Sequence, residues 1–278
     1  MNNEKSFALI GYPLGHSLSP VIHSELFKIA NLSASYKLLE IEPKSLESKA
    51  DELKSLQGFN VTIPHKTNII PFLDELSDKA RLFGAVNTVD CKNGRLIGCN
   101  TDCIGFLRAL NAAGIELGGR VLICGCGGVS RMFAFESALA GGEITFAIRE
   151  GSMQKCKALC SELEEKLGKK SNIVLLSDAG KGYDLIINGT PVGMFPNVDE
   201  CPLSEETIIS SGAVFDAIYN PEETALLKIA KSSGIKHLNG LSMLVWQAAA
   251  AEEIWNGVDF SEDEINNIVD KLRVKSEK

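Results

Sequence analysis

Three short stretches in the first 102 residues carry polar side chains that an ordinary loop would not need. In the first, Ser17 and Ser19 stand just before a helix, so two hydroxyls and helix-start amides could form a neutral cradle for a carboxylate. In the second, Asn60 and Thr62 alternate onto one face of a strand, and Lys66 follows just past a proline. These residues indicate a binding site for a small polar molecule.

The third stretch places an amide, a hydroxyl and a carboxylate at a helix start, in Asn100, Thr101 and Asp102. Two of these polar residues also have a purely structural interpretation. Ser19 could be an N-cap, and Asp102 could be a first-turn acid favoured by the helix dipole. The residues alone leave both interpretations open.

A glycine-rich turn, Gly125-Cys126-Gly127-Gly128-Val129, follows a predicted strand and opens a predicted helix. That context is typical of a dinucleotide-binding turn, in which glycines let the backbone approach a pyrophosphate. Ser130 replaces the third glycine of the usual pattern. Arg149 after the next strand could pair with a 2′-phosphate, whereas Glu150 would repel one, so the turn favours NADP over NAD.

Short apolar runs alternate with amphipathic segments along the chain, which is typical of α/β proteins with parallel sheets. We expect strands at residues 7–10, 36–41, 59–63, 121–124, 144–148, 173–176, 184–188 and 213–218, and a hairpin at 90–96 turning at Asn93-Gly94. We expect helices at residues 19–31, 45–56, 101–113, 152–167, 223–233, 241–255 and 262–275.

The length of 278 residues favours two domains. We place an N-terminal α/β substrate-binding and catalytic domain at residues 1–104 and a Rossmann-like dinucleotide-binding domain at 105–240, with a cleft between them. The helices of residues 241–278 are expected to pack back on the first domain.

Composition excludes several classes of protein. The net charge of −8 argues against a nucleic-acid partner, because such binding needs clustered cations. The longest uncharged stretch contains two prolines and four serines, so we expect no membrane helix. The eight cysteines include no C-x-x-C pair and lie far from the histidines, which favours buried reduced thiols in a cytoplasmic protein over a zinc site.

The quoted stretches resemble the signature blocks of the shikimate dehydrogenase family, which also includes quinate/shikimate enzymes. Further blocks match in the same order: Gly84-Ala85-Val86-Asn87-Thr88, Asn188-Gly189-Thr190-Pro191-Val192-Gly193-Met194, Asp216-Ala217-Ile218-Tyr219 and Gly240-Leu241-Ser242-Met243-Leu244-Val245-Trp246-Gln247. The resemblance runs almost from end to end of the chain.

The resemblance implies an oxidoreductase that reversibly reduces 3-dehydroshikimate to shikimate with NADP, in the chorismate branch of aromatic amino-acid biosynthesis. It implies that Lys66 and Asp102 are the catalytic pair and that no metal is needed. Substrate binding is assigned by resemblance to Ser17, Ser19, Asn60, Thr62, Asn87, Tyr219 and Gln247. Cofactor binding is assigned to Gly125, Cys126, Gly127, Gly128, Val129, Arg149, Ala217, Gly240, Met243 and, with least weight, Asp78.

Two departures from the family pattern bear on these expectations. Where the family commonly has Asn-Arg-Thr, this chain has Ile148-Arg149-Glu150, so two of three phosphate-side contacts are missing. Ser24 replaces a common asparagine at what we expect to be a supporting position.

Two alternatives stay open. One is a quinate/shikimate dehydrogenase with relaxed use of NAD and NADP, and the other is a non-catalytic dinucleotide-binding redox sensor. The presence of both Ser17 and Ser19 favours shikimate, since the quinate branch often alters one of them. We expect a monomer or a homodimer.

Overall fold

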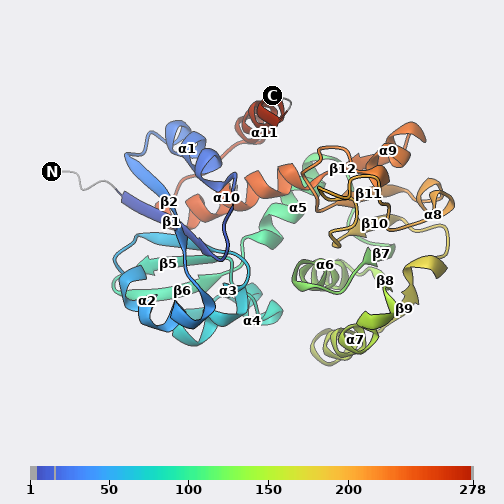
Figure 1. Ribbon diagram of the computed structural model, residues 1–278, viewed down its shortest axis with the longest axis horizontal. Helices are drawn as coiled ribbons and strands as arrows, with labels where there is room; N and C mark the ends of the chain where they lie inside the picture. The colour runs from blue at the N-terminus through green and yellow to red at the C-terminus, as the bar shows by residue number, and fades with distance from the viewer. Residues whose placement is uncertain (1–4, 16, 277–278) are drawn as a thin grey trace. The chain divides into compact units, whose positions relative to one another are not determined.

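The computed structural model describes residues 5–15 and 17–276, which form two compact α/β units (Figure 1). Unit 1 comprises Met1–Phe106 and Leu244–Lys278, and unit 2 comprises Leu107–Met243. Each unit contains one six-stranded sheet. The α/β class expected from the sequence is confirmed, and the chain returns to unit 1 for its last 35 residues, counted from 244 to 278.

Unit 1 is built from short strands and helices that alternate along the chain. Its strands are β1 (Lys5–Gly11), β2 (Ala34–Glu40), β3 (Gly58–Val61), β4 (Glu75–Leu76), β5 (Thr88–Lys92) and β6 (Arg95–Cys99). Its helices are α1 (Ser19–Ile29), α2 (Leu46–Leu53), α3 (His65–Asn68), α4 (Asp78–Phe83), the start of α5 (Asp102–Ala112), most of α10 (Gly240–Asn256), and α11 (Glu262–Ser276).

The sheet of unit 1 has the strand order β2-β1-β3-β5-β6-β4. β1 pairs in parallel with both β2 and β3, and β5 pairs antiparallel with β3 and β6. The predicted hairpin joins β5 to β6, and Asn93 and Gly94 both have positive φ, at 55° and 75°. A two-residue turn of that kind suits a tight hairpin.

Helix α10 is fixed to the sheet of unit 1 by a tryptophan. The Trp255 indole nitrogen donates to the Val89 carbonyl at 2.9 Å, and a Cβ on Gly58 would lie 2.2 Å from the same nitrogen. Glycine at position 58 therefore lets the indole lie against the strand backbone. Helix α11 packs against α1 (Figure 1).

Unit 2 has a purely parallel sheet with the strand order β12-β11-β10-β7-β8-β9. Its strands are β7 (Arg120–Cys124), β8 (Glu143–Ile148), β9 (Ser171–Leu175), β10 (Leu185–Asn188), β11 (Ala213–Asp216) and β12 (Lys236–Leu238). Its complete helices are α6 (Gly128–Leu139), α7 (Met153–Leu167), α8 (Glu205–Ile209) and α9 (Ala225–Ser232).

Numbered from β7, this order reads 6-5-4-1-2-3, which is the doubly wound order of dinucleotide-binding folds. The chain reverses its direction of winding between β7 and β10, and ligands of such sheets bind outside the carboxyl ends of the strands at this point. The glycine-rich turn follows β7, so the topology places it at the switch point.

Two local expectations need correction. Ser19 is the first residue of α1 and not its N-cap, a position that Leu18 occupies, and α1 ends at Ile29. The strand expected at 59–63 ends at Val61, so Thr62 lies just beyond it. Four short elements were not expected from the sequence, and they span only two to five residues each: β4, α3, α8 and β12.

All eight cysteines are free thiols; Cys103, Cys124, Cys126 and Cys156 are buried, and the other four are partly exposed. Within the described residues, no group of three or more metal-binding side chains could hold an ion, and no helix is long and apolar enough to cross a membrane.

Candidate active site

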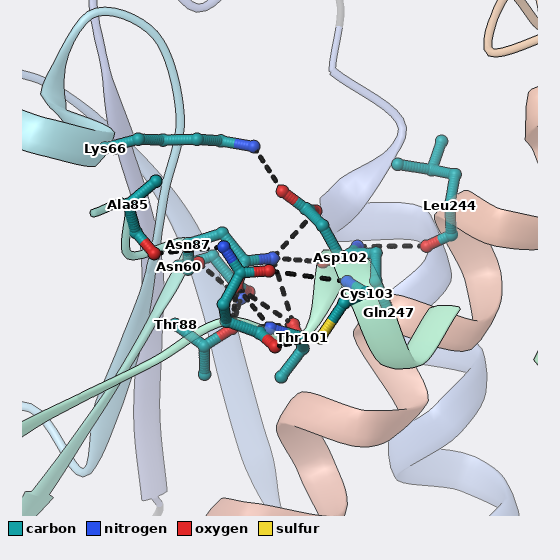
Figure 2. Close-up of polar contacts among 11 residues, drawn as sticks. Asn60, Lys66, Ala85, Asn87, Thr88, Thr101, Asp102, Cys103, Leu244 and Gln247 are labelled. Carbon is teal, nitrogen blue, oxygen red and sulfur yellow. Dashed lines mark hydrogen bonds and ion pairs between the residues drawn. The ribbon is translucent and has the colours of Figure 1, made fainter. Parts of the chain in front are cut away.

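A lysine and a carboxylate from separate elements of unit 1 meet as an ion pair (Figure 2). Lys66 lies in α3, and Asp102 is the first residue of α5. The Lys66 ammonium donates to Asp102 Oδ2 at 2.6 Å. The lysine side chain is 32% exposed and the aspartate side chain 18%, so a small ligand can reach both.

Asn87 fixes the second oxygen of this carboxylate. Its Nδ2 donates to Asp102 Oδ1 at 2.8 Å and to the Thr101 hydroxyl at 3.0 Å. Its Oδ1 accepts from the Thr101 backbone amide at 2.6 Å. Asn87 is only 3% exposed, so this side chain is a buried connector that holds the start of α5 and aims Asp102 at Lys66.

Other polar residues complete the network around Asn87 (Figure 2). The Thr88 and Thr101 hydroxyls lie 2.8 Å apart, and both residues are fully buried. Gln247 Oε1 lies 3.3 Å from Asn87 Nδ2 and shares the two hydrogens of that nitrogen with the shorter contacts to Asp102 and Thr101, while the Gln247 amide nitrogen donates to the Leu244 carbonyl. Asn87 therefore links Asp102, which lies 15 positions later in the sequence, to Gln247, which lies 160 positions later.

Asn60 can offer a ligand only its oxygen. Its Nδ2 donates to the Asn87 carbonyl at 3.2 Å and to the Thr88 hydroxyl at 2.9 Å, which uses both of its donor hydrogens. Its Oδ1 accepts from the Tyr36 hydroxyl at 2.7 Å and retains one further lone pair. Asn60 is 4% exposed, so any hydrogen bond that it makes to a ligand would have to use this oxygen as the acceptor.

Ser17, before α1, and Ser19, the first residue of α1, interact with each other. The Ser17 hydroxyl oxygen accepts from the Ser19 amide at 3.2 Å, which leaves the Ser17 O–H able to donate. Pro20 has no amide hydrogen. An anion at this helix start would therefore depend more on the two hydroxyls than on the amides, in contrast to the cradle expected from the sequence. Thr62 is partly buried, and its methyl carbon would lie 2.5 Å from a Cβ on Gly11.

In unit 2, the backbone requires glycine at only some positions of the turn after β7. Gly125 has φ +88°, and a Cβ there would lie 2.8 Å from the Thr190 side chain. Gly127 has an ordinary φ of −78°, and Gly128 is not in the left-handed region. A Cβ on either would meet no atom of the described residues within 4 Å. The fold does not demand glycine at 127 and 128, and the open space above them can admit a ligand.

The structure also explains why Ser130 replaces the third glycine. Ser130 is fully buried, and its hydroxyl lies 3.4 Å from the Gly189 carbonyl oxygen. A Cβ on Gly189 would lie 2.4 Å from that hydroxyl. The close approach of helix to strand is preserved because the small residue stands at 189, after β10, instead of at 130.

A pocket of about 260 Å³ lies beside the turn and is lined by Cys126, Gly127, Gly128, Arg131, Lys155, Ala158, Leu159 and Glu162. Arg131 makes a two-point ion pair with Glu162 and lies over the Phe135 ring. Arg149 and Glu150, at the end of β8, are both exposed. The Arg149 cation and the Glu150 carboxylate are therefore neighbours at the position where a 2′-phosphate is expected.

A carboxylate at the end of β11 organises the neighbouring loops of unit 2. Asp216 accepts from Asn188 Nδ2 at 3.0 Å, from the Thr224 hydroxyl at 2.7 Å and from the Ile218 amide at 3.0 Å. Burial raises its pKa to about 6, against the opposing effect of these hydrogen bonds. Asn188 in turn accepts from Thr190.

The remaining predicted contacts of unit 2 surround the start of α10. A Cβ on Gly240 would lie 2.1 Å from the Ala217 carbonyl oxygen, so glycine is required there. Met243 is buried and Tyr219 is 38% exposed, and partial burial raises the pKa of the Tyr219 phenol. Asp78 belongs to unit 1, where it is an exposed first-turn residue of α4.

Three supporting residues were not among the predicted site residues. Thr88 and Thr101 brace Asn87, and Tyr36 donates to Asn60. The two threonines are polar residues within stretches that match the family, so the sequence could have indicated their role in the site. Tyr36 carries none, since an aromatic residue is an ordinary occupant of a strand.

Comparison with known proteins gives a consistent family assignment. Residues 9–89 match the model of the shikimate dehydrogenase substrate binding domain, and residues 240–269 match that of the shikimate 5′-dehydrogenase C-terminal domain. The NADP(+) shikimate dehydrogenase of Methanocaldococcus jannaschii is 42% identical over 280 residues, covering 96% of this chain and 97% of the relative.

Solved structures agree with this result. A shikimate dehydrogenase in complex with NADP+ superposes with a TM-score of 0.89 at 40% identity, covering 97% of this chain and 96% of that one. The Listeria monocytogenes shikimate 5-dehydrogenase in complex with shikimate and NAD gives a TM-score of 0.89 at 34% identity, covering 97% of both chains. The chain therefore belongs to the shikimate dehydrogenase family.

Proposed function

We propose that this protein catalyses the NADP-dependent, reversible reduction of 3-dehydroshikimate to shikimate in aromatic amino-acid biosynthesis. The observation that carries the proposal is the 2.6 Å Lys66–Asp102 pair, partly open to solvent and fixed from behind by Asn87. Unit 1 supplies the substrate-binding and proton-transferring groups, and unit 2 holds the cofactor.

NADP, when bound, supplies or receives the hydride, so the protein must manage one proton and the geometry. In reduction, the Lys66 ammonium hydrogen-bonds to the substrate carbonyl oxygen and donates the proton that completes the hydroxyl. In oxidation, the neutral amine accepts that proton. Asp102 keeps the lysine in place and bonds the neighbouring hydroxyl, while Asn87 prevents the carboxylate from rotating.

The substrate carboxylate is assigned to Ser17 and Ser19. The Ser17 hydroxyl can donate to it while still accepting from the Ser19 amide. Asn60 accepts from a ring hydroxyl through its free lone pair, and Thr62 and Gln247 contact the rest of the ring. Tyr219 of unit 2 keeps its substrate assignment on the family resemblance.

The residues of unit 2 fit a dinucleotide. The open space above Gly127 and Gly128, at the amino end of α6, suits a pyrophosphate that needs close backbone approach. We assign Gly125, Cys126 and Val129 to the same turn, Arg149 to the 2′-phosphate, and Ala217, Gly240 and Met243 to the nicotinamide end. Asp78 is kept as a weaker cofactor assignment.

A second candidate function is a quinate/shikimate dehydrogenase that also uses NAD. Glu150 beside Arg149 favours it, because an exposed carboxylate there weakens binding of a 2′-phosphate. Purified protein should be assayed with shikimate and with quinate, each with NADP+ and with NAD+. The proposal expects the highest kcat/KM for shikimate with NADP+. A higher value for quinate or NAD+ would move the assignment to the second candidate, and inactivity with all four pairs would favour a redox sensor.

We further propose a cytoplasmic monomer or homodimer with no nucleic-acid partner. The net charge of −8 supports the last point, because it opposes binding to a phosphate backbone. Light scattering coupled to gel filtration would measure the oligomeric state.

A further inference from the structure

A fully buried histidine–glutamate pair lies inside unit 1, away from the lysine–aspartate pair. His23 on α1 and Glu252 on α10 are both 0% exposed, and His23 Nδ1 lies 2.5 Å from Glu252 Oε1. The second oxygen, Oε2, accepts from Asn256 Nδ2 at 2.7 Å, and Asn256 Oδ1 accepts from the Lys5 ammonium. The other imidazole nitrogen, Nε2, is buried without a hydrogen-bond partner among the described residues, so the contact with Glu252 at Nδ1 orients the ring.

The imidazole supports the ring of Tyr36. The two rings stack with their centroids 3.9 Å apart and their planes 9° apart. Trp255 and Phe27 flank the imidazole at 5.7 Å and 6.2 Å. The Tyr36 ring therefore lies on a rigid surface, and the position of its hydroxyl is set by packing.

That hydroxyl connects two residues assigned to the substrate. It donates to Asn60 Oδ1 at 2.7 Å, and a hydrogen bond with the Ser19 side chain opposes the upward shift of the Tyr36 pKa. Burial, with a smaller contribution from the Glu252 charge, raises that pKa well above its ordinary value, so the phenol keeps its proton.

Three hydrogen bonds orient the Asn60 amide, and Tyr36 supplies the one to its oxygen. Thr88 and the Asn87 carbonyl accept from the amide nitrogen, and Tyr36 holds the oxygen. Without the Tyr36 hydroxyl the amide keeps its two donated hydrogen bonds, but its oxygen loses the bond that fixes its position for accepting from a ligand hydroxyl.

We propose that Tyr36 is a positioning residue for substrate binding, held by the buried His23–Glu252 pair and acting through Asn60. The proposal rests on the proposed function, because it assigns the Asn60 oxygen to a hydroxyl of shikimate. Since that contact exists in both ground and transition states, Tyr36 should affect KM for shikimate more than kcat.

The test is Tyr36→Phe, which keeps the stacked ring and removes only the hydroxyl. Loss of one directing hydrogen bond should raise KM for shikimate about tenfold, with kcat within about twofold. KM for NADP+ and the melting temperature should stay near wild type. Tyr183→Phe, at a buried tyrosine of unit 2, is the matched control and should leave KM for shikimate unchanged.

A double-mutant cycle with Asn60→Ala tests whether Tyr36 acts through Asn60. If it does, adding Tyr36→Phe to Asn60→Ala should change kcat/KM by less than about twofold. An unchanged KM in Tyr36→Phe, or the same loss in both backgrounds, would overturn the inference while the wild type remains active. A wild-type protein with no shikimate-dependent reduction of NADP+ would overturn the proposed function, and this inference with it.

Discussion

The two units prepare their ligand-binding regions in opposite ways. In unit 1, Asp102, Asn87 and Asn60 have nearly every hydrogen-bonding atom committed to a named partner. In unit 2, the turn after β7 depends on the lack of side chains, because Gly127 and Gly128 leave space that no described residue fills. A proton transfer needs polar atoms held at fixed positions, whereas binding a dinucleotide needs backbone that is not covered by side chains.

The comparison predicts its largest effect at Asp102. Both partners of this carboxylate are donors, so in Asp102→Asn the new amide nitrogen must face either Lys66 or Asn87. We expect kcat to fall by about 10²–10⁴-fold, as for loss of an acid–base group. Steady-state kinetics measures the fall, and circular dichroism should show a wild-type fold. A kcat within a few-fold of wild type would remove Asp102 from the mechanism.

Unit 2 also contains a hydrogen-bonded polar network around Asp216. There the ionised carboxylate lowers the stability of the folded state. Because the folded pKa is raised from 3.8 to about 6, the folded state retains a proton that the unfolded state loses between these values. Stability from this group is therefore greatest below about pH 4 and falls as pH rises, by at most about 3 kcal/mol.

Asp216→Asn removes this titration while still offering an oxygen to Asn188 and Ile218. Between about pH 4 and pH 7, the unfolding free energy of the variant should improve relative to wild type by up to about 3 kcal/mol. Urea titrations at a series of pH values would measure the difference. A difference that does not vary with pH would show that Asp216 has no raised pKa.

Two glycine substitutions separate the structural glycine from the ligand-facing one. Gly128→Ala should raise KM for NADP+ by about tenfold with little change in melting temperature, because its Cβ meets only open space in the protein. Gly125→Ala, at φ +88° and beside Thr190, should lower stability by about 1–3 kcal/mol. Similar losses of stability in both variants would contradict the distinction.

Sequence reasoning found the parts of the fold that depend on local pattern. The hairpin at Asn93-Gly94, the long strands of unit 2 and the turn before α6 all have local signals. It missed β12, a three-residue edge strand whose pairing with β11 depends on a distant neighbour. The local pattern also left open an N-cap role for Ser19, whereas the helix begins one residue earlier than that role requires, with Leu18 at the N-cap and no side-chain cap.

The candidate site shows the same limit. The family blocks named Lys66, Asp102 and Asn87, but no local pattern could show that one asparagine joins Asp102 to Gln247. The support of Asn60 by Tyr36 was invisible for the same reason, since it depends on strands brought together by the sheet.

The most direct test of the division of labour between the units is Lys66→Ala, with turnover and cofactor binding measured on the same preparation. The account predicts that kcat for shikimate oxidation falls by about 10²–10⁴-fold, because the proton has no acceptor. It predicts that the NADP+ dissociation constant from calorimetry stays within about twofold of wild type. Near-normal kcat, or an equal loss of NADP+ affinity, would contradict the account.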